Sequence, residues 1–267
     1  FGNIYYTKKG TGSPILLIHD TLPGASGYEW SKIEDELAID HTVYTVDLLG
    51  CGRSDKSSIT YTNFVYVQMI SDFIKKIIGQ KTDVIASGFS GSFVTMACHN
   101  EKELFNKIML VNPPSLTQLK QMPNRKDRLL KAALEIPIFG TLVYHMIVSR
   151  DNINNLFIEK MYYNPFHVDN QMADAYYEAA HKGGYYTRFL YSSLAAKYIN
   201  INICHALKAL DNSIYIVEGE TEPNGKAVTD DYCASNPAIE VSVLKETKHL
   251  PHVEAPEAFL EQVKIFF

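Results

Sequence analysis

Residues 82–97 read Thr82-Asp83-Val84-Ile85-Ala86-Ser87-Gly88-Phe89-Ser90-Gly91-Ser92-Phe93-Val94-Thr95-Met96-Ala97. An apolar run rich in β-branched residues leads through small residues and one serine into a segment compatible with a helix. This pattern predicts a strand, a sharp turn and a helix, with Ser90 at the turn. Such a turn is a nucleophile elbow, in which strained backbone makes a serine hydroxyl project from the top of a sheet.

The spacing around Ser90 is close to the usual elbow pattern. Gly88 lies two residues before it, and Ser92 lies two residues after it, where the pattern has a second glycine. Small residues are required there because the strand and helix backbones approach closely. Taken alone, the string is also compatible with an ordinary strand-to-helix turn that carries a solvated serine. The rest of the chain must decide between the two.

Length and composition are those of a globular α/β domain. The chain has 267 residues, of which 46% are hydrophobic and 21% charged. That is enough apolar material for a sizeable core, with room for an inserted subdomain. The net charge is −5 and no run of Lys and Arg occurs, which excludes nucleic acid as a partner.

Cysteine usage and hydropathy bear on the compartment. The four cysteines are far apart in the sequence and have neither metal-ligand spacing nor the density of a disulfide framework, which favours a reducing, cytoplasmic setting. No stretch reaches the roughly 20 apolar residues that span a bilayer. The chain begins at Phe1, without Met and inside a strand-like run. We therefore expect that the chain is trimmed at its N-terminus. An upstream signal or membrane anchor, and with it a membrane-associated location, stays an alternative.

Strand-like and helix-like segments alternate through the first half of the chain. Apolar runs at 15–18, 42–48 and 107–111 are separated by segments with helical periodicity, such as 28–38 and 66–78. Alternation of this kind predicts a parallel sheet wound with helices on both faces. Ligands of such sheets bind at the carboxyl ends of the strands, where Ser90 would point.

The alternation of strand-like and helix-like segments ends between residues 115 and 210, where five segments have helical periodicity. Strand-like runs resume at 213–217 and 240–244, and a helix closes the chain. We expect residues 1–114 and 211–267 to form the core, and residues 115–210 to form a helical cap over the site.

The sequence resembles the α/β-hydrolase superfamily over nearly its whole length. The motifs that carry the resemblance are the apolar strand before His19-Asp20, the turn Asp47-Leu48-Leu49-Gly50-Cys51-Gly52-Arg53-Ser54-Asp55, the elbow at Ser90, Gly219-Glu220-Thr221-Glu222 after a strand, and His249-Leu250-Pro251-His252-Val253-Glu254. Each motif is modest alone, but together they occur in the family's order and at suitable strand ends. The resemblance implies a mostly parallel, doubly wound sheet with an inserted cap.

The resemblance also implies a catalytic triad. A serine hydroxyl needs an adjacent base, and the base needs a carboxylate to orient it. In the family's order of serine, acid and histidine, Ser90 is the expected nucleophile, His249 the base and Glu222 the acid. The family usually has Asp at the acid position, and Glu218 and Glu220 are competing candidates.

The expected oxyanion donors are the backbone N–H groups of Gly91 and Thr21, again by resemblance. An acyl-transfer site requires such donors where the tetrahedral oxyanion forms. The residue after His19 is usually Gly, so Asp20 departs from the pattern. A carboxylate near a developing oxyanion is unfavourable unless it is paired or points away.

The cap is rich in tyrosine and contains an apolar segment at 136–147. The tyrosines suit either helix packing or a pocket for an aromatic or acyl group. The segment is either buried against the core or a hydrophobic mouth toward lipid or a lipophilic substrate.

These features predict a serine hydrolase that cleaves a carboxylic ester or related acyl compound through Ser90. No cofactor is expected, and no residue cluster has metal-ligand spacing. A carbon–carbon bond hydrolase or an acyltransferase would use the same serine. A non-catalytic binding or receptor module on this fold is the alternative from another class, favoured by Asp20, Ser92 and Glu222.

Overall fold

The computed structural model describes residues 2–267 and contains a seven-stranded sheet. The strands are β1 (Tyr6–Lys9), β2 (Ser13–Ile18), β3 (His41–Val46), β4 (Thr82–Ser87), β5 (Phe105–Val111), β6 (Ile214–Gly219) and β7 (Glu240–Leu244). Their order is β1-β3-β2-β4-β5-β6-β7, in which β1 is antiparallel to β3 and all other neighbours are parallel. The predicted fold class is therefore confirmed.

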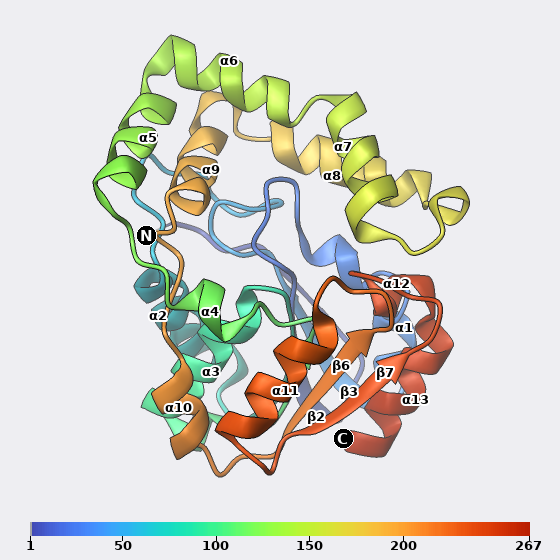
Figure 1. Ribbon diagram of the computed structural model, residues 1–267. Coiled ribbons are helices and arrows are strands. Elements are labelled where there is room, and N and C mark those ends of the chain that lie inside the picture. Colours follow the sequence, from blue (N-terminus) through green and yellow to red (C-terminus); the bar gives the residue numbers. More distant parts are fainter. Residues whose placement is uncertain (1) are drawn as a thin grey trace.

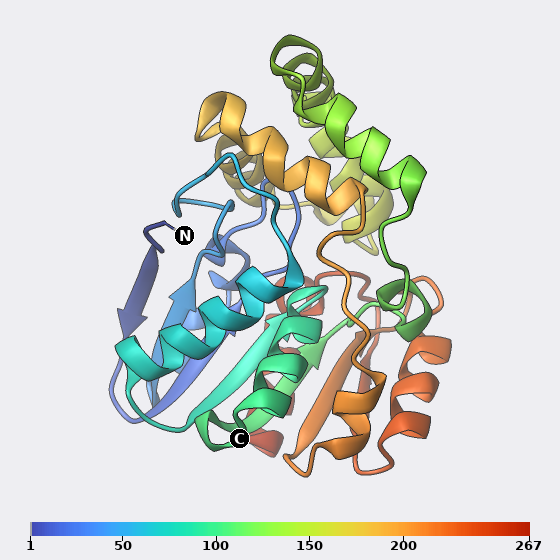
Figure 2. The ribbon, with the colours of Figure 1, turned by 90° about the vertical axis from the view of Figure 1, so that its left-hand side faces the viewer.

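The sheet is buried on both faces because its central strands are apolar throughout. In β2, Leu16 and Ile18 pack into one core cluster, whereas Ile15 and Leu17 pack into the other. This alternation follows from the two-residue period of a strand. Figure 2 shows α2 (Asn63–Phe73) and α3 (Ser90–Asn100) in front of the sheet, and the opposite face is covered by α13 (Pro256–Phe266), which packs on β6 and β7.

A group of helices between β5 and β6 lies over the carboxyl ends of the strands (Figure 1). They are α5 (Arg125–Glu135), α6 (Pro137–Ile147), α7 (Arg150–Leu156), α8 (Asn170–His181) and α9 (Thr187–Ala195), and all fall inside the range predicted for the cap. Two short helices in the same range lie against the core: α4 (Leu116–Leu119) packs on α11 (Gly225–Ser235), and α10 (Cys204–Ala209) packs on α3.

Two local predictions differ from the structure. Residues 28–38 have amphipathic spacing, but they form a 3₁₀ turn, Gly27–Trp30, followed by the short helix α1 (Glu34–Leu37). The predicted helix 66–78 begins earlier, at Asn63, because the Thr62 side chain accepts a hydrogen bond from the Val65 N–H and caps it.

No single helix within residues 2–267 is long and apolar enough to cross a membrane. Helices α5 and α6 reach that length and composition only together, and they meet at an angle of 96°.

Candidate active site

The sharp turn between β4 and α3 is made by Gly88, not by Ser90. Strand β4 ends at Ser87, α3 begins at Ser90, and Gly88 between them has φ +54°. Glycine adopts this left-handed conformation without a steric penalty. A Cβ at Gly88 would lie 2.1 Å from Cγ of Asp20 and 2.2 and 2.4 Å from its two carboxylate oxygens. The strained elbow position therefore has no side chain, and the Asp20 carboxylate fills the space beside it.

Ser90 lies in the first turn of α3 and is fully buried. Its hydroxyl donates to the carbonyl of His19 at 2.5 Å and lies 3.2 Å from the Thr21 hydroxyl. Because the Ser90 proton is used toward His19, the Thr21 hydroxyl is the donor in the second contact. These bonds hold the loop after β2. Among the described residues, the polar partners of the His249 ring are Glu222 and Asp20, so the structure does not bring Ser90 and His249 together.

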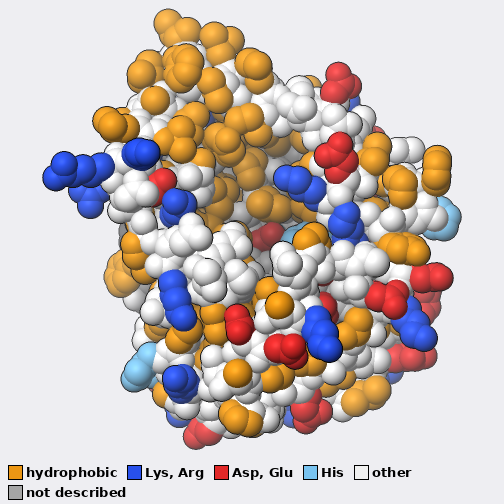
Figure 3. All heavy atoms as spheres, in the orientation of Figure 1, with side chains coloured by type: hydrophobic (Ala, Val, Ile, Leu, Met, Phe, Trp, Pro, Cys, Tyr) orange, Lys and Arg blue, Asp and Glu red, His pale blue; other side chains and the backbone are white. Residues whose placement is uncertain are grey.

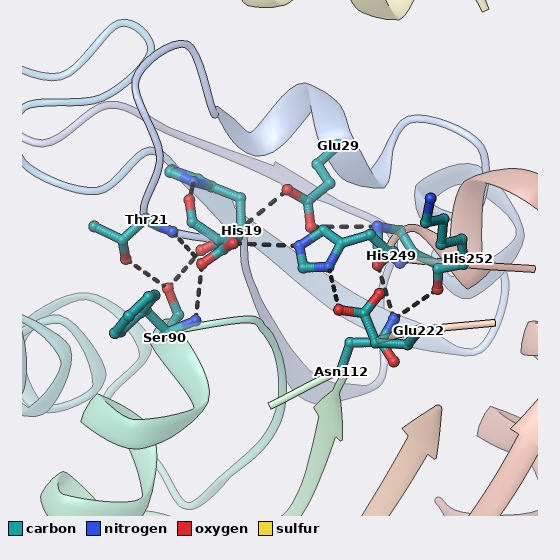
Figure 4. Close-up of polar contacts among 11 residues, drawn as sticks. His19, Thr21, Glu29, Ser90, Asn112, Glu222, His249 and His252 are labelled. Atoms are coloured by element: carbon teal, nitrogen blue, oxygen red, sulfur yellow. Dashed lines mark hydrogen bonds and ion pairs between the residues drawn. The ribbon is translucent and has the colours of Figure 1, made fainter. Parts of the chain in front are cut away.

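The two carboxylate oxygens of Asp20 have different surroundings. Oδ1 accepts hydrogen bonds from the backbone N–H of Thr21 at 2.6 Å and of Phe89 at 2.8 Å. Oδ2 lies 3.5 Å from Nε2 of His249. In Figure 4, Thr21 and Ser90 lie to the left, and His249 and Glu222 lie to the right.

Glu222 and His249 are brought together from two loops at the ends of β6 and β7. Glu222 Oε1 lies 3.2 Å from His249 Nδ1. Asn112, at the end of β5, fixes both loops: its amide donates to the carbonyls of Lys248 and His249, and its carbonyl accepts the Gly219 N–H. The result is a line of three groups, Asp20, His249 and Glu222.

The two competing carboxylates lie elsewhere. Glu220 is exposed, and its Oε2 accepts the backbone N–H of Glu246. Glu218 is buried in the wall of the cleft, where burial raises the pKa of its carboxyl group.

His249 is held in its charged form. Burial alone would lower its pKa, but the hydrogen bonds to Asp20 and Glu222 outweigh burial and raise the pKa to about 10. At neutral pH the ring is an imidazolium that donates from Nδ1 to Glu222 and from Nε2 toward Asp20. An imidazolium can give up a proton but cannot accept one, so the resting site lacks a free base at His249.

The predicted oxyanion donors are engaged differently from the expectation. The N–H of Gly91 bonds to the carbonyl of Gly88, and the N–H of Thr21 bonds to Asp20. The donor opposite Thr21 is the N–H of Phe89, which the sequence prediction missed. The sequence contained one signal for an elbow centred on Gly88. Small residues lie two positions before and two positions after Gly88, at Ala86 and Ser90, just as Gly88 and Ser92 lie around Ser90.

Buried groups beneath Asp20 hold its loop. His19 Nε2 accepts the Leu48 N–H at 3.0 Å, so Nδ1 carries the proton and donates to the Asp20 carbonyl at 2.6 Å. Glu29 accepts the Asp20 N–H at 3.4 Å and lies 3.3 Å from Nε2 of His252. Burial would raise the pKa of Glu29, but His252 outweighs it and the pKa is lowered. The loop that carries Asp20 is therefore held by the hydrogen bonds of the His19 ring and by Glu29, which also contacts His252.

A cleft of about 530 Å³ opens in front of these groups, beneath the cap. Asp20, Gly88, Phe89, Glu222 and His249 line it. Figure 3 shows this face hollowed below the cap, with hydrophobic side chains around the hollow. Its apolar lining residues include Leu22, Pro113, Pro114, Leu156, Met161 and Val228. Within residues 2–267, no group of three or more His, Cys, Asp and Glu side chains has an arrangement that could hold a metal ion.

The sequence matches the alpha/beta hydrolase family over residues 15–262. A 2-hydroxy-6-oxo-6-(2'-aminophenyl)hexa-2,4-dienoic acid hydrolase of Metapseudomonas resinovorans is 29% identical over 113 residues, which are 42% of this chain and 39% of the relative. The soluble epoxide hydrolase of Corynebacterium sp. (strain C12) is 24% identical over 41% of this chain and 37% of the relative. The chain thus matches well under half the length of these two curated relatives.

Solved structures share the fold over nearly the whole chain. A meta-cleavage product hydrolase from Pseudomonas fluorescens IP01 covers 99% of this chain and 93% of its own, with a TM-score of 0.78 and 19% identity. The epoxide hydrolase CorEH covers 99% and 94%, with a TM-score of 0.80 and 17% identity. At these identities the likeness concerns the fold and carries no activity.

Proposed function

The chain belongs to the alpha/beta hydrolase family, and from that premise we propose that it hydrolyses a small, mostly apolar molecule in the cleft beneath the cap. Asp20, His249 and Glu222 are the groups that face the substrate. The observation that supports this assignment is the Asp20 carboxylate beside Gly88, with one oxygen on two N–H donors and the other 3.5 Å from His249.

Ester cleavage by Ser90, which the sequence favours, has less support from the geometry. The Ser90 hydroxyl is buried and bonded to His19, and the residues that line the described cleft include Gly88 and Phe89 but not Ser90. Attack by Ser90 would require α3 and the loop after β2 to separate. Carboxylic esters nevertheless belong in a substrate panel, because carboxylesterases share the fold.

A binding module without turnover is the second candidate. The observation that favours it is the same carboxylate, because Asp20 occupies the N–H donors that an oxyanion of the substrate would need. This candidate predicts that ligands enter the cleft and leave unchanged.

The experiment is a hydrolysis panel of p-nitrophenyl esters, a vinylogous 1,5-diketone and terminal epoxides. It compares the wild type with His249→Gln and Ser90→Ala. The control is Glu220→Gln, in the loop that carries Glu222. We expect at least one class to be hydrolysed, a loss of about 10²-fold or more in His249→Gln, and retained turnover per folded molecule in Ser90→Ala and Glu220→Gln.

Two results would contradict the proposal. Turnover lost in Ser90→Ala, with an unchanged circular dichroism spectrum, would restore the serine mechanism. Ligand binding in the cleft without turnover of any class would favour the binding module.

A further inference from the structure

We infer that Asp20 is the nucleophile, and that the substrate is an epoxide, in which a saturated carbon carries an oxygen leaving group. This inference rests on the proposed function and names the bond-forming residue and the substrate class. Asp20 is 4% exposed and lies in the cleft lining. Its Oδ1 is bound by two N–H groups, whereas Oδ2 is directed at His249 and is the oxygen left to meet an electrophile.

The occupied N–H donors decide between two kinds of electrophile. Attack on an ester carbonyl would place negative charge on the substrate's own oxygen, which would need the N–H groups of Thr21 and Phe89. Asp20 Oδ1 already holds both. Attack on a saturated carbon creates no tetrahedral oxyanion, and the charge that develops on the oxygen of an opening epoxide can be met by a proton from His249 instead of by these N–H groups. A saturated carbon is therefore the electrophile that this site accommodates.

The charge state of His249 selects the leaving group. In the first step a lone pair of Oδ2 forms a bond to the epoxide carbon, and the carbon–oxygen bond of the ring breaks with its electron pair moving to oxygen. The imidazolium of His249 gives its Nε2 proton to that oxygen. A halide leaving group would take no proton, so the proton of His249 would have to leave by another route before His249 could act as the base of the next step.

The second step returns the site to its starting state. Ester formation removes the charge of Asp20, one of the two carboxylates that keep His249 protonated. Neutral His249, oriented by Glu222, takes a proton from water, and the water oxygen bonds to Cγ of Asp20. The bond from Cγ to Oδ2 breaks, and the departing alkoxide takes the proton of the new carboxyl group. The products are a diol, the Asp20 carboxylate and the His249 imidazolium.

The backbone donors fit this second step. When water attacks Cγ, negative charge develops on Oδ1, which lies 2.6 and 2.8 Å from the nitrogens of Thr21 and Phe89. Those distances are typical of oxyanion holes. The donors that appear blocked in the resting site therefore stabilise the hydrolysis of an aspartyl ester.

The test follows oxygen-18 from water. Enzyme in excess over styrene oxide or a straight-chain terminal epoxide is allowed one turnover in oxygen-18 water, and the diol and the Asp20 peptide are analysed by mass spectrometry. We expect one heavy oxygen in the Asp20 peptide and none in the first diol, because the diol takes its new oxygen from Asp20. The matched control is the peptide of Asp47, a buried carboxylate that also accepts two backbone N–H bonds but lies outside the cleft lining.

Asp20→Asn is the variant that accompanies the label. Its amide oxygen can still accept the Thr21 and Phe89 N–H bonds, so the loop is expected to fold, while epoxide turnover falls by about 10³-fold or more. Label found in the first diol and absent from the Asp20 peptide would overturn the nucleophile and leave the proposed hydrolase intact. Hydrolysis of esters or diketones but of no epoxide would overturn the substrate class alone. Failure of the whole panel would contradict both proposals.

Discussion

The Asp20 carboxylate and the bare Cα of Gly88 occupy complementary space at the end of β4, because a Cβ at Gly88 would lie 2.1 Å from Asp20 Cγ. A side chain at position 88 would clash with the Asp20 carboxylate, so the two positions fit together as Gly and Asp. The left-handed residue of the elbow therefore carries no side chain, and a carboxylate from the loop after β2 lies beside it.

This pairing predicts non-additive effects on stability. Gly88→Ala should lower the free energy of unfolding by the strain of φ +54°, about 1–3 kcal/mol, and further by the clash with Asp20. Combining it with Asp20→Gly should remove the clash, giving a coupling of about 0.5–3 kcal/mol in urea unfolding. Gly79→Ala is the matched control, because Gly79 has φ +74° and open space at its Cβ position. Additive effects of Gly88→Ala and Asp20→Gly would contradict the close approach.

The raised pKa of His249 predicts a pH-dependent stability. The folded pKa of about 10 exceeds the ordinary value of 6.5. The stabilisation is therefore complete below about pH 6.5 and is lost as the pH rises through about 10. Chemical unfolding of the wild type should show this decline, and His249→Gln should not. A nuclear magnetic resonance titration of Glu222→Gln should find a lower His249 pKa, since one of two carboxylates is gone; an unchanged value would mean that Glu222 does not contribute.

Asn112 should act on the site by positioning His249. Asn112→Ala removes the bonds to the Lys248 and His249 carbonyls and leaves the Gly219 N–H unpaired. We expect a loss of about 1–3 kcal/mol in stability and a fall in kcat of about tenfold or more, with a smaller change in KM. Asn106→Ala, at the other end of β5, is the control. Its side chain bonds to Asp83, so it should affect stability without lowering kcat.

The apolar face of α6 predicts attachment to an anionic lipid surface. Helix α6 contains no Lys, Arg, Asp or Glu and exposes Ile138, Phe139, Leu142 and Met146, and the first turn of the preceding helix, α5, exposes Arg125, Lys126 and Arg128. Exposed apolar residues together with basic residues are typical of interfacial helices. The wild type should float with vesicles of phosphatidylcholine and phosphatidylglycerol, and Leu142→Glu should not.

The control for that flotation experiment is Ile265→Glu, on an exposed position of α13 away from the cap. It should bind as the wild type does. Equal loss in both variants, or a concentration-dependent dimer in place of vesicle binding, would contradict attachment through α6.

The sequence predicts the sheet well because its signal is local. Runs such as Ile15 to Ile18 are apolar at every position, as strands covered on both faces must be. The pairing of Glu222 with His249 follows from the order of motifs at strand ends. The boundaries in 28–38 were missed because amphipathic spacing does not distinguish one helix from two short turns.

The centre of the site could not be predicted in the same way. An elbow motif is recognised by a nucleophilic residue between small residues. Ser90 meets this criterion, whereas Gly88 has no side chain and does not. The two frames, 86–90 and 88–92, both have small residues at the required spacing. Only the conformation of Gly88 and the path of the Asp20 carboxylate across two loops decide between them.

The most direct test of the account is intact mass after incubation with a fluorophosphonate probe. We predict no adduct on the wild type or Ser90→Ala, and one adduct on the double variant Asp20→Gly/Gly88→Ser, in which a hydroxyl replaces the carboxylate opposite His249. The double variant also shows that the probe enters the cleft. A single adduct on the wild type that disappears in Ser90→Ala would contradict the account, because it would make Ser90 the activated nucleophile.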